Sequence, residues 1–200
     1  GIHFAYVSDD TSPGNGKYFC GGLKEPRLSQ AAAEVGEALA TLPAEAWDNI
    51  DLKYLLLCSE AKAQNRTIGG IPVPPIKLLM LSVGQSTGSR LSYTTLHELY
   101  HMVEFQHGAY NDAEWNERFE GYDNRYGSVN TALGSGGAGF INAYGKSFPH
   151  EERAELFAIR MHNPRSLGLH LKAHPNQTLV DKVLYMQQKC ADLLGSSTCN

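Results

Sequence analysis

The chain has 200 residues, of which 42% are hydrophobic, and its formal net charge at neutral pH is −4. This length suits a single domain that buries a sizeable hydrophobic core. Because the basic residues are scattered and no apolar run approaches the length of a transmembrane helix, we expect neither nucleic acid nor a membrane as a partner.

The first predicted elements belong to a scaffold. Residues 2–7 form a strand-like apolar run, and residues 29–42 have the alanine-rich, amphipathic pattern of a helix that Pro43 ends. Pro43 can also open a short second helix through Trp47. No signal peptide precedes the first strand, as we expect of a mature secreted chain, which would have lost one.

Two hydrophobic strands are predicted next, at residues 53–58 and 76–83. Residues 65–75 lie between them and contain two consecutive glycines and three prolines, which is typical of a loop or hairpin. A mixed sheet followed by a helix is therefore the expected upper lobe, residues 1–108.

The most informative stretch, residues 96–103, contains the pattern His-Glu-x-x-His. Apolar residues recur there at positions i, i+3, i+4 and i+7, which predicts a helix with one buried face. Ser92 can cap the start of this helix, and Gly108 can end it in a left-handed turn.

His97 and His101 are four residues apart, so both imidazoles project from one helix face and can share a metal ion. Glu98 lies about 100° round the helix, where it can contact a metal-bound water without binding the metal. Zinc chemistry needs nitrogen ligands, an open coordination position and a carboxylate that takes a proton from water. We therefore predict Zn²⁺ as the cofactor and Glu98 as the general base. The alternative is a chance match, which the helical context and a second segment downstream disfavour.

Residues 108–147 are rich in Gly, Asn, Tyr and Ser, with Gly134–Gly139 at their centre. A phosphate-binding loop is one interpretation, but no strand precedes these glycines and no helix start with Lys-Ser/Thr follows them. We predict a mobile flap or surface loop that borders the cleft.

A second functional helix is expected between Pro149, which can open it, and Pro164, which must close it. One face of this helix carries two carboxylates and two small residues, Glu151, Ala154, Glu155 and Ala158. Such a stripe suits close packing on the zinc helix, with one glutamate binding the metal and the other supporting a ligand. The alternative is a solvent-facing acidic helix start that the helix macrodipole stabilises.

Three more motifs accompany the HELYH sequence: Glu114-Trp115, Gly139-Phe140-Ile141-x-x-Tyr144 and the run 151–157. Through these motifs, over residues 90–162, the chain resembles the gluzincin-type zinc metallopeptidases. It is similar there to the catalytic domain of anthrax lethal factor and to secreted Pro-Pro endopeptidases. Over residues 1–89 the resemblance extends only to the order of elements.

The resemblance implies a zincin-like α+β fold: a small mixed sheet, an HExxH helix and a mostly helical C-terminal lobe, residues 109–200. In that family a tyrosine stands seven residues before the ligating glutamate, and an Ala-Glu pair follows that glutamate after two more residues. By this resemblance Glu151 is the third zinc ligand and Glu155 is the carboxylate that supports a ligand. Tyr144 is then the phenol that stabilises the oxyanion.

His107 is a rival third ligand because it stands at the last position of the metzincin pattern HExxHxxGxxH. That pattern requires glycine at position 104, where this chain has Glu104, and Asn130 stands at the candidate for a Met-turn. If the helix runs to His107, that side chain points about 120° away from His101. We therefore favour the gluzincin arrangement. His150 could line the cleft, but we predict a surface histidine.

The four cysteines are widely spaced and form no CxxC pair, which favours two disulfides and an oxidising compartment. Of three possible connectivities we predict Cys20–Cys58 with Cys190–Cys199, because the second bond would fix the C-terminal tail. The alternative is four buried free thiols in a cytosolic protein. Asn65 and Asn176 begin glycosylation sequons, which matter only in a source that glycosylates.

These residues predict a secreted, monomeric zinc endopeptidase that acts on peptide or protein substrates. Zinc lowers the pKa of a bound water, Glu98 accepts its proton and passes it to the leaving amine, and Tyr144 helps to hold the oxyanion charge. Two alternatives remain: a non-catalytic zinc-binding module of the same fold and a metal-dependent hydrolase of a non-peptide substrate. Glu98 favours an enzyme, because a binding module needs no base at that position.

Overall fold

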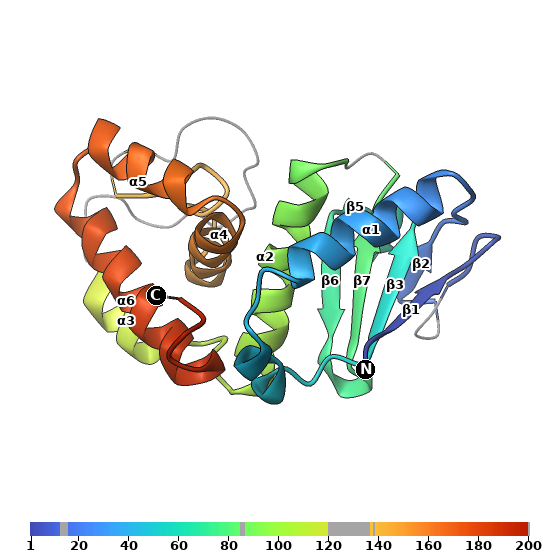
Figure 1. The fold of residues 1–200 in the computed structure, drawn as a ribbon, viewed down its shortest axis with the longest axis horizontal. Coiled ribbons are helices and arrows are strands. Elements are labelled where there is room, and N and C mark those ends of the chain that lie inside the picture. The colour runs from blue at the N-terminus through green and yellow to red at the C-terminus, as the bar shows by residue number, and fades with distance from the viewer. Residues whose placement is uncertain (13–15, 85–86, 120–136, 138, 200) are drawn as a thin grey trace.

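The computed structural model describes residues 1–12, 16–84, 87–119, 137 and 139–199 (Figure 1). Its main sheet has four strands in the order β1 (His3–Tyr6), β3 (Tyr54–Cys58), β7 (Leu78–Ser82) and β6 (Gly70–Val73). The first three of these strands are parallel, and β6 pairs antiparallel with β7, so the sheet is mixed. A smaller antiparallel sheet has the order β2 (Tyr18–Cys20), β4 (Ala61–Ala63) and β5 (Arg66–Ile68).

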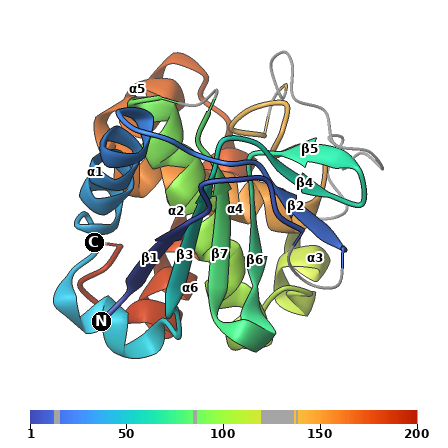
Figure 2. The ribbon, with the colours of Figure 1, turned by 90° about the vertical axis from the view of Figure 1, so that its right-hand side faces the viewer.

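Strands β3 and β7 are buried on both faces and alternate between two hydrophobic cores, as central parallel strands do. The larger core receives Leu55, Leu57, Leu79 and Leu81. It also contains side chains of helices α1 (Arg27–Leu39) and α2 (Ser89–Gln106), which lie behind the sheet in Figure 2. Leu56 and Met80 face the other way, into a smaller core that includes Cys20 and Ala61 of the second sheet.

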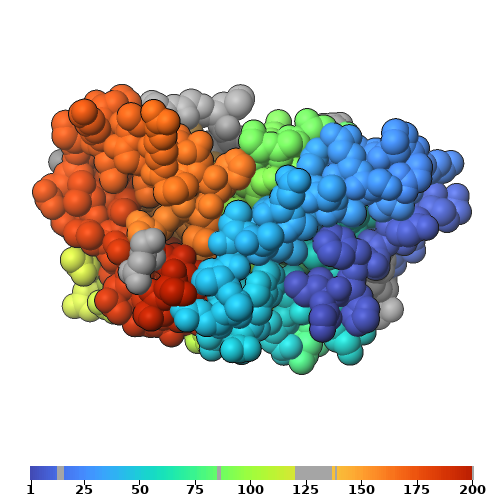
Figure 3. Space-filling model, in the orientation of Figure 1, coloured from blue at the N-terminus to red at the C-terminus, as the bar shows by residue number. Residues whose placement is uncertain are grey.

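The remaining helices follow α2 in the sequence: α3 (Ala113–Phe119), α4 (Pro149–His162), α5 (Pro164–Ala173) and α6 (Gln177–Leu194). Two short 3₁₀ helices, η1 (Ala44–Asn49) and η2 (Pro74–Ile76), complete the described elements. Helix α2 runs between the sheet and the C-terminal helices (Figure 1). The N-terminal half and the C-terminal helices therefore occupy opposite ends of the surface in Figure 3.

Helices α2 and α4 pack directly on each other. The rings of Tyr100 and Phe157 stack across this interface with centroids 4.8 Å apart. Ala154 and Ala158 are fully buried, and their small side chains allow the two helices to approach closely. This packing places the acidic stripe of α4 against the face of α2 that carries the histidines.

The predicted fold class is confirmed: the chain is α+β, with a small mixed sheet, a histidine-bearing helix and a helical C-terminal part. Gly108 follows α2 with φ +66°, in the predicted left-handed conformation. One prediction was wrong in detail. Gly88 precedes α2, so Ser92 lies inside the helix, where its hydroxyl donates to the carbonyl of Glu34. Residues 65–75, predicted as a loop or hairpin, contain β5 and β6, which pair antiparallel with β4 and β7.

The predicted flap at Gly134–Gly139 falls largely on residues outside the described part of the chain, as does Asn130. Both disulfides form with the predicted connectivity. Cys20–Cys58 joins β2 to β3, and Cys190–Cys199 joins α6 to the C-terminal tail. Among the described helices, none combines the length and the apolar character that crossing a membrane requires.

Candidate metal centre

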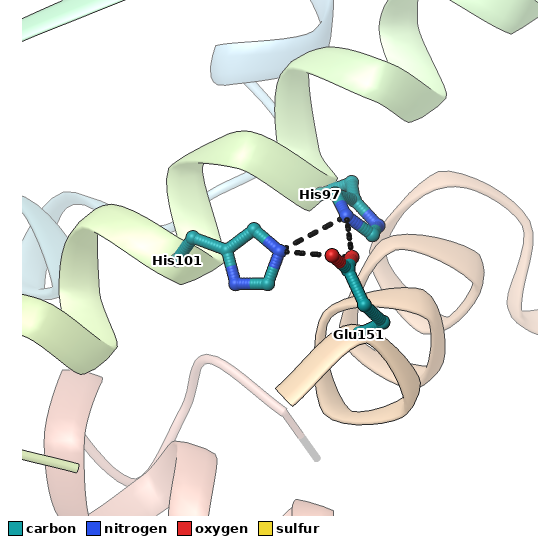
Figure 4. A group of neighbouring side chains, drawn as sticks. All are labelled: His97, His101 and Glu151. Atoms are coloured by element: carbon teal, nitrogen blue, oxygen red, sulfur yellow. Dashed lines mark hydrogen bonds and ion pairs between the residues drawn. The ribbon is translucent and has the colours of Figure 1, made fainter. Parts of the chain in front are cut away.

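Three buried side chains from α2 and α4 meet at one point (Figure 4). His97 and His101 project from the same face of α2, and Glu151 reaches them from the first turn of α4. The Nε2 atoms of the two histidines are 3.1 Å apart, and Oε2 of Glu151 lies 3.1 Å from the first and 3.2 Å from the second. The structure thus brings together the two histidines and the glutamate that the sequence had predicted as ligands.

The triangle formed by these donor atoms fits a zinc ion. Zinc binds histidine nitrogen and carboxylate oxygen at about 2.0–2.1 Å, so two ligand atoms of a tetrahedral site lie about 3.3 Å apart. The observed edges of 3.1–3.2 Å are close to that separation. All three residues also line a cavity of about 930 Å³, so a fourth coordination position can face the space that a substrate would enter.

Glu155 lies directly behind His97. Its Oε1 is 2.8 Å from Nδ1 of His97, while Tyr93 and Asn142 donate hydrogen bonds to Oε2. Burial alone would raise the pKa of Glu155, but these contacts hold it below its ordinary value. An ionised carboxylate at Nδ1 keeps the proton on that nitrogen and leaves Nε2 free to bind a metal.

Glu104 has the corresponding place behind His101, with Oε2 3.5 Å from Nδ1. It is fully buried and forms an ion pair with Nε of Arg153, whose Nη2 also donates to the carbonyl of Tyr110 at 2.8 Å. This position of Glu104 was not predicted, because in the sequence Glu104 is only a mismatch to the metzincin glycine. Because Glu104 lies three residues after His101, on the same helix face, its spacing could have predicted that the two side chains are close.

Glu98 lines the cavity next to the histidines. Burial raises the pKa of its carboxyl group, an effect that the neighbouring His97 and His101 oppose. Glu98 lies in the cavity wall beside the two histidines, where a proton acceptor for a metal-bound water would have to lie.

Tyr144 lines the same cavity, with its ring centroid 5.7 Å from that of His97. Burial, followed by the carboxylates of Glu151 and Glu98, raises the pKa of its phenol. The hydroxyl group is therefore protonated at neutral pH and can donate a hydrogen bond, and the carboxylate of Glu151 is a hydrogen-bond partner of it.

His150 is not a simple surface residue, contrary to the prediction. Its ring lies between those of Tyr110 and Phe148, with centroids 4.5 and 5.4 Å away, and is 5.7 Å from the ring of His101. Its Nε2 is 3.6 Å from Oε1 of Glu151, the oxygen that faces away from the other histidines. By contrast, His107 ends α2 with Nε2 3.0 Å from the carbonyl oxygen of Asn49.

No family model and no curated protein sequence matches this chain. Among solved structures, the chain is similar to a protein of Bacteroides caccae described as a "putative zinc-binding metallo-peptidase". The two share 14% sequence identity with a TM-score of 0.51, over 83% of this chain and 71% of the other. At this level of identity the similarity shows a common fold, in which this chain carries its own buried His-His-Glu group.

Proposed function

We propose that this protein is a secreted zinc-dependent endopeptidase whose metal is held by His97, His101 and Glu151. The observation that carries the proposal is the triangle of donor atoms, with edges of 3.1–3.2 Å, in the wall of a cavity of about 930 Å³. Glu98 in the same wall supports a catalytic role over metal binding alone. The zincin-like fold shared with the Bacteroides caccae protein gives independent support.

The roles of the residues follow from their positions. A zinc ion in this site would polarise a peptide carbonyl and lower the pKa of water. Glu98 accepts the proton of the attacking water and delivers it to the leaving amine. Tyr144 donates a hydrogen bond to the oxyanion, and the loss of one such donor typically costs about 3 kcal/mol. Glu155 and Glu104 orient the two histidines from behind.

Two disulfides support an oxidising, extracellular location, since such bonds are rare in the cytosol. We further propose that residues 1–200 act as a single domain and as a monomer, with a peptide or protein as the partner. The competing functions are a non-catalytic zinc module and a hydrolase of non-peptide substrates. The following experiment separates the proposed endopeptidase from both.

The test is digestion of a peptide library by the zinc-loaded protein, with cut sites mapped by mass spectrometry. Glu98→Gln is the matched variant because it keeps the shape of the side chain and all three ligands. We expect cleavage by the wild type, and a rate reduced by roughly 10²–10⁴ in Glu98→Gln with zinc content unchanged. No cleavage by the wild type, or undiminished cleavage by Glu98→Gln, would contradict the proposal.

A further inference from the structure

Strand β6 begins with a glycine, Gly70, preceded by Gly69, and both line the cavity beside the metal centre. Helix α2 lies next to this strand (Figure 1), and its residues Thr94 and Glu98, one turn apart, face the two glycines. Neither glycine has a positive φ, so the backbone conformation does not require glycine at either position. The remaining constraint is the space available to a Cβ atom, and this space differs between Gly69 and Gly70.

A Cβ atom added at Gly70 would lie 2.6 Å from Cγ of Glu98. It would also lie 3.0 Å from Cδ2 of Leu81 and 3.1 Å from the carbonyl oxygen of Met80. Because carbon atoms in contact are about 3.5–4.0 Å apart, the side chain of Glu98 would have to move by about 1 Å. At Gly69 the nearest atom to an added Cβ is Cγ2 of Thr94 at 3.4 Å, which is an ordinary contact.

We propose that Gly70 is a positioning residue for Glu98. The bare backbone of β6 at Gly70 is the surface against which the stem of Glu98 packs, and it sets where the carboxylate enters the cavity. This inference rests on the proposed function, in which Glu98 is the proton acceptor. A misplacement of about 1 Å at a catalytic group can lower the rate about 10²-fold.

The first test compares Gly70→Ala with the matched variant Gly69→Ala, both loaded with zinc. Gly70→Ala is expected to keep the zinc content of the wild type and to lose about 10²-fold in kcat with KM little changed. Gly69→Ala, whose added Cβ makes only an ordinary contact with Thr94, is expected to lose much less kcat than Gly70→Ala. An unchanged kcat in Gly70→Ala, or an equal loss in Gly69→Ala, would overturn the inference.

The second test does not depend on turnover. Acetohydroxamate chelates zinc, and a carboxylate beside the metal can accept its hydroxyl proton, so calorimetric titration of the zinc-loaded protein reports the position of Glu98. Because each substitution removes or displaces a hydrogen bond to a charged group, both Gly70→Ala and Glu98→Gln should weaken acetohydroxamate binding roughly 10–100-fold. Adding Gly70→Ala to Glu98→Gln should then have no further effect. Additive losses would show that Gly70 acts elsewhere and would overturn the inference.

This titration separates the two proposals. Suppose that the wild type cleaves no peptide while Gly70→Ala and Glu98→Gln have non-additive effects on acetohydroxamate affinity. In that case the endopeptidase proposal fails and the positioning role of Gly70 stands. If peptides are cleaved and Gly70→Ala binds acetohydroxamate like the wild type, the positioning role fails alone.

If Gly70→Ala does not fold, the double variant with Glu98→Ala decides the question by thermal unfolding. Glu98→Ala removes the Cγ atom 2.6 Å from the added Cβ, so the double variant should recover a cooperative transition. If the double variant also fails to fold, the added Cβ clashes with Met80 or Leu81 rather than with Glu98, and the inference is overturned.

Discussion

Replacement of Glu155 by alanine should weaken zinc binding without removing a metal ligand. The carboxylate of Glu155 contacts Nδ1 of His97 at 2.8 Å and is itself fixed by hydrogen bonds from Tyr93 and Asn142. Without it, the imidazole loses both its orientation and the acceptor that keeps the proton on Nδ1. Losses of this kind typically cost about 10–100-fold in metal affinity, which corresponds to about 1.4–2.7 kcal/mol.

The assay is a competition titration of the metal-free protein against a chromophoric zinc chelator at constant pH. Glu155→Gln should weaken affinity less than Glu155→Ala, because its amide oxygen can still accept from His97. Glu117→Ala, which removes an exposed carboxylate on α3, is the control and should leave the affinity unchanged. Wild-type affinity in a folded Glu155→Ala would refute the reasoning that Glu155 orients His97.

Two further predictions concern the supports of the site. Arg153→Met removes the arginine partner of the buried Glu104 and leaves its carboxylate, among the described residues, only Nδ1 of His101 at 3.5 Å, which should destabilise the fold by about 3–5 kcal/mol and lower Tm by roughly 6–20 °C in a chain of this length. Differential scanning calorimetry measures this, and an unchanged Tm would contradict it. Tyr144→Phe should bind zinc normally and lose about 10²–10³-fold in kcat, measured by steady-state cleavage of a peptide substrate, because the proposed oxyanion donor is removed together with its hydrogen bond to Glu151. A loss of zinc instead would make Tyr144 part of the metal site.

The local parts of the fold and site could be predicted from the sequence. The periodicity around residues 96–103 places His97 and His101 on one face of a helix, since ligands four residues apart need only that helix to meet. Pro149 begins α4, because the fixed φ of proline suits the first helical turn, and α4 ends at His162, before Pro164, as predicted. Glu151 is distant in sequence, and only the family resemblance singled it out.

Features that depend on long-range packing could not be predicted. The glycines and prolines of residues 65–75 indicate a loop or hairpin but do not show that β6 is the edge strand of the main sheet, where Pro72 is tolerated and Gly70 lies against Glu98. Glu104 looks like an ordinary polar helix residue until Arg153 packs against it from α4. His150 likewise acquires its neighbours Tyr110 and Phe148 only in the folded chain.

The most direct test of the account is the zinc content of the purified protein and its ligand variants, measured by elemental mass spectrometry after dialysis. We expect about one zinc per wild-type chain, a loss of zinc in His101→Ala and in Glu151→Ala, and full retention in His107→Ala. A chain that keeps stoichiometric zinc without Glu151 and loses it without His107 would contradict the metal centre described for this protein.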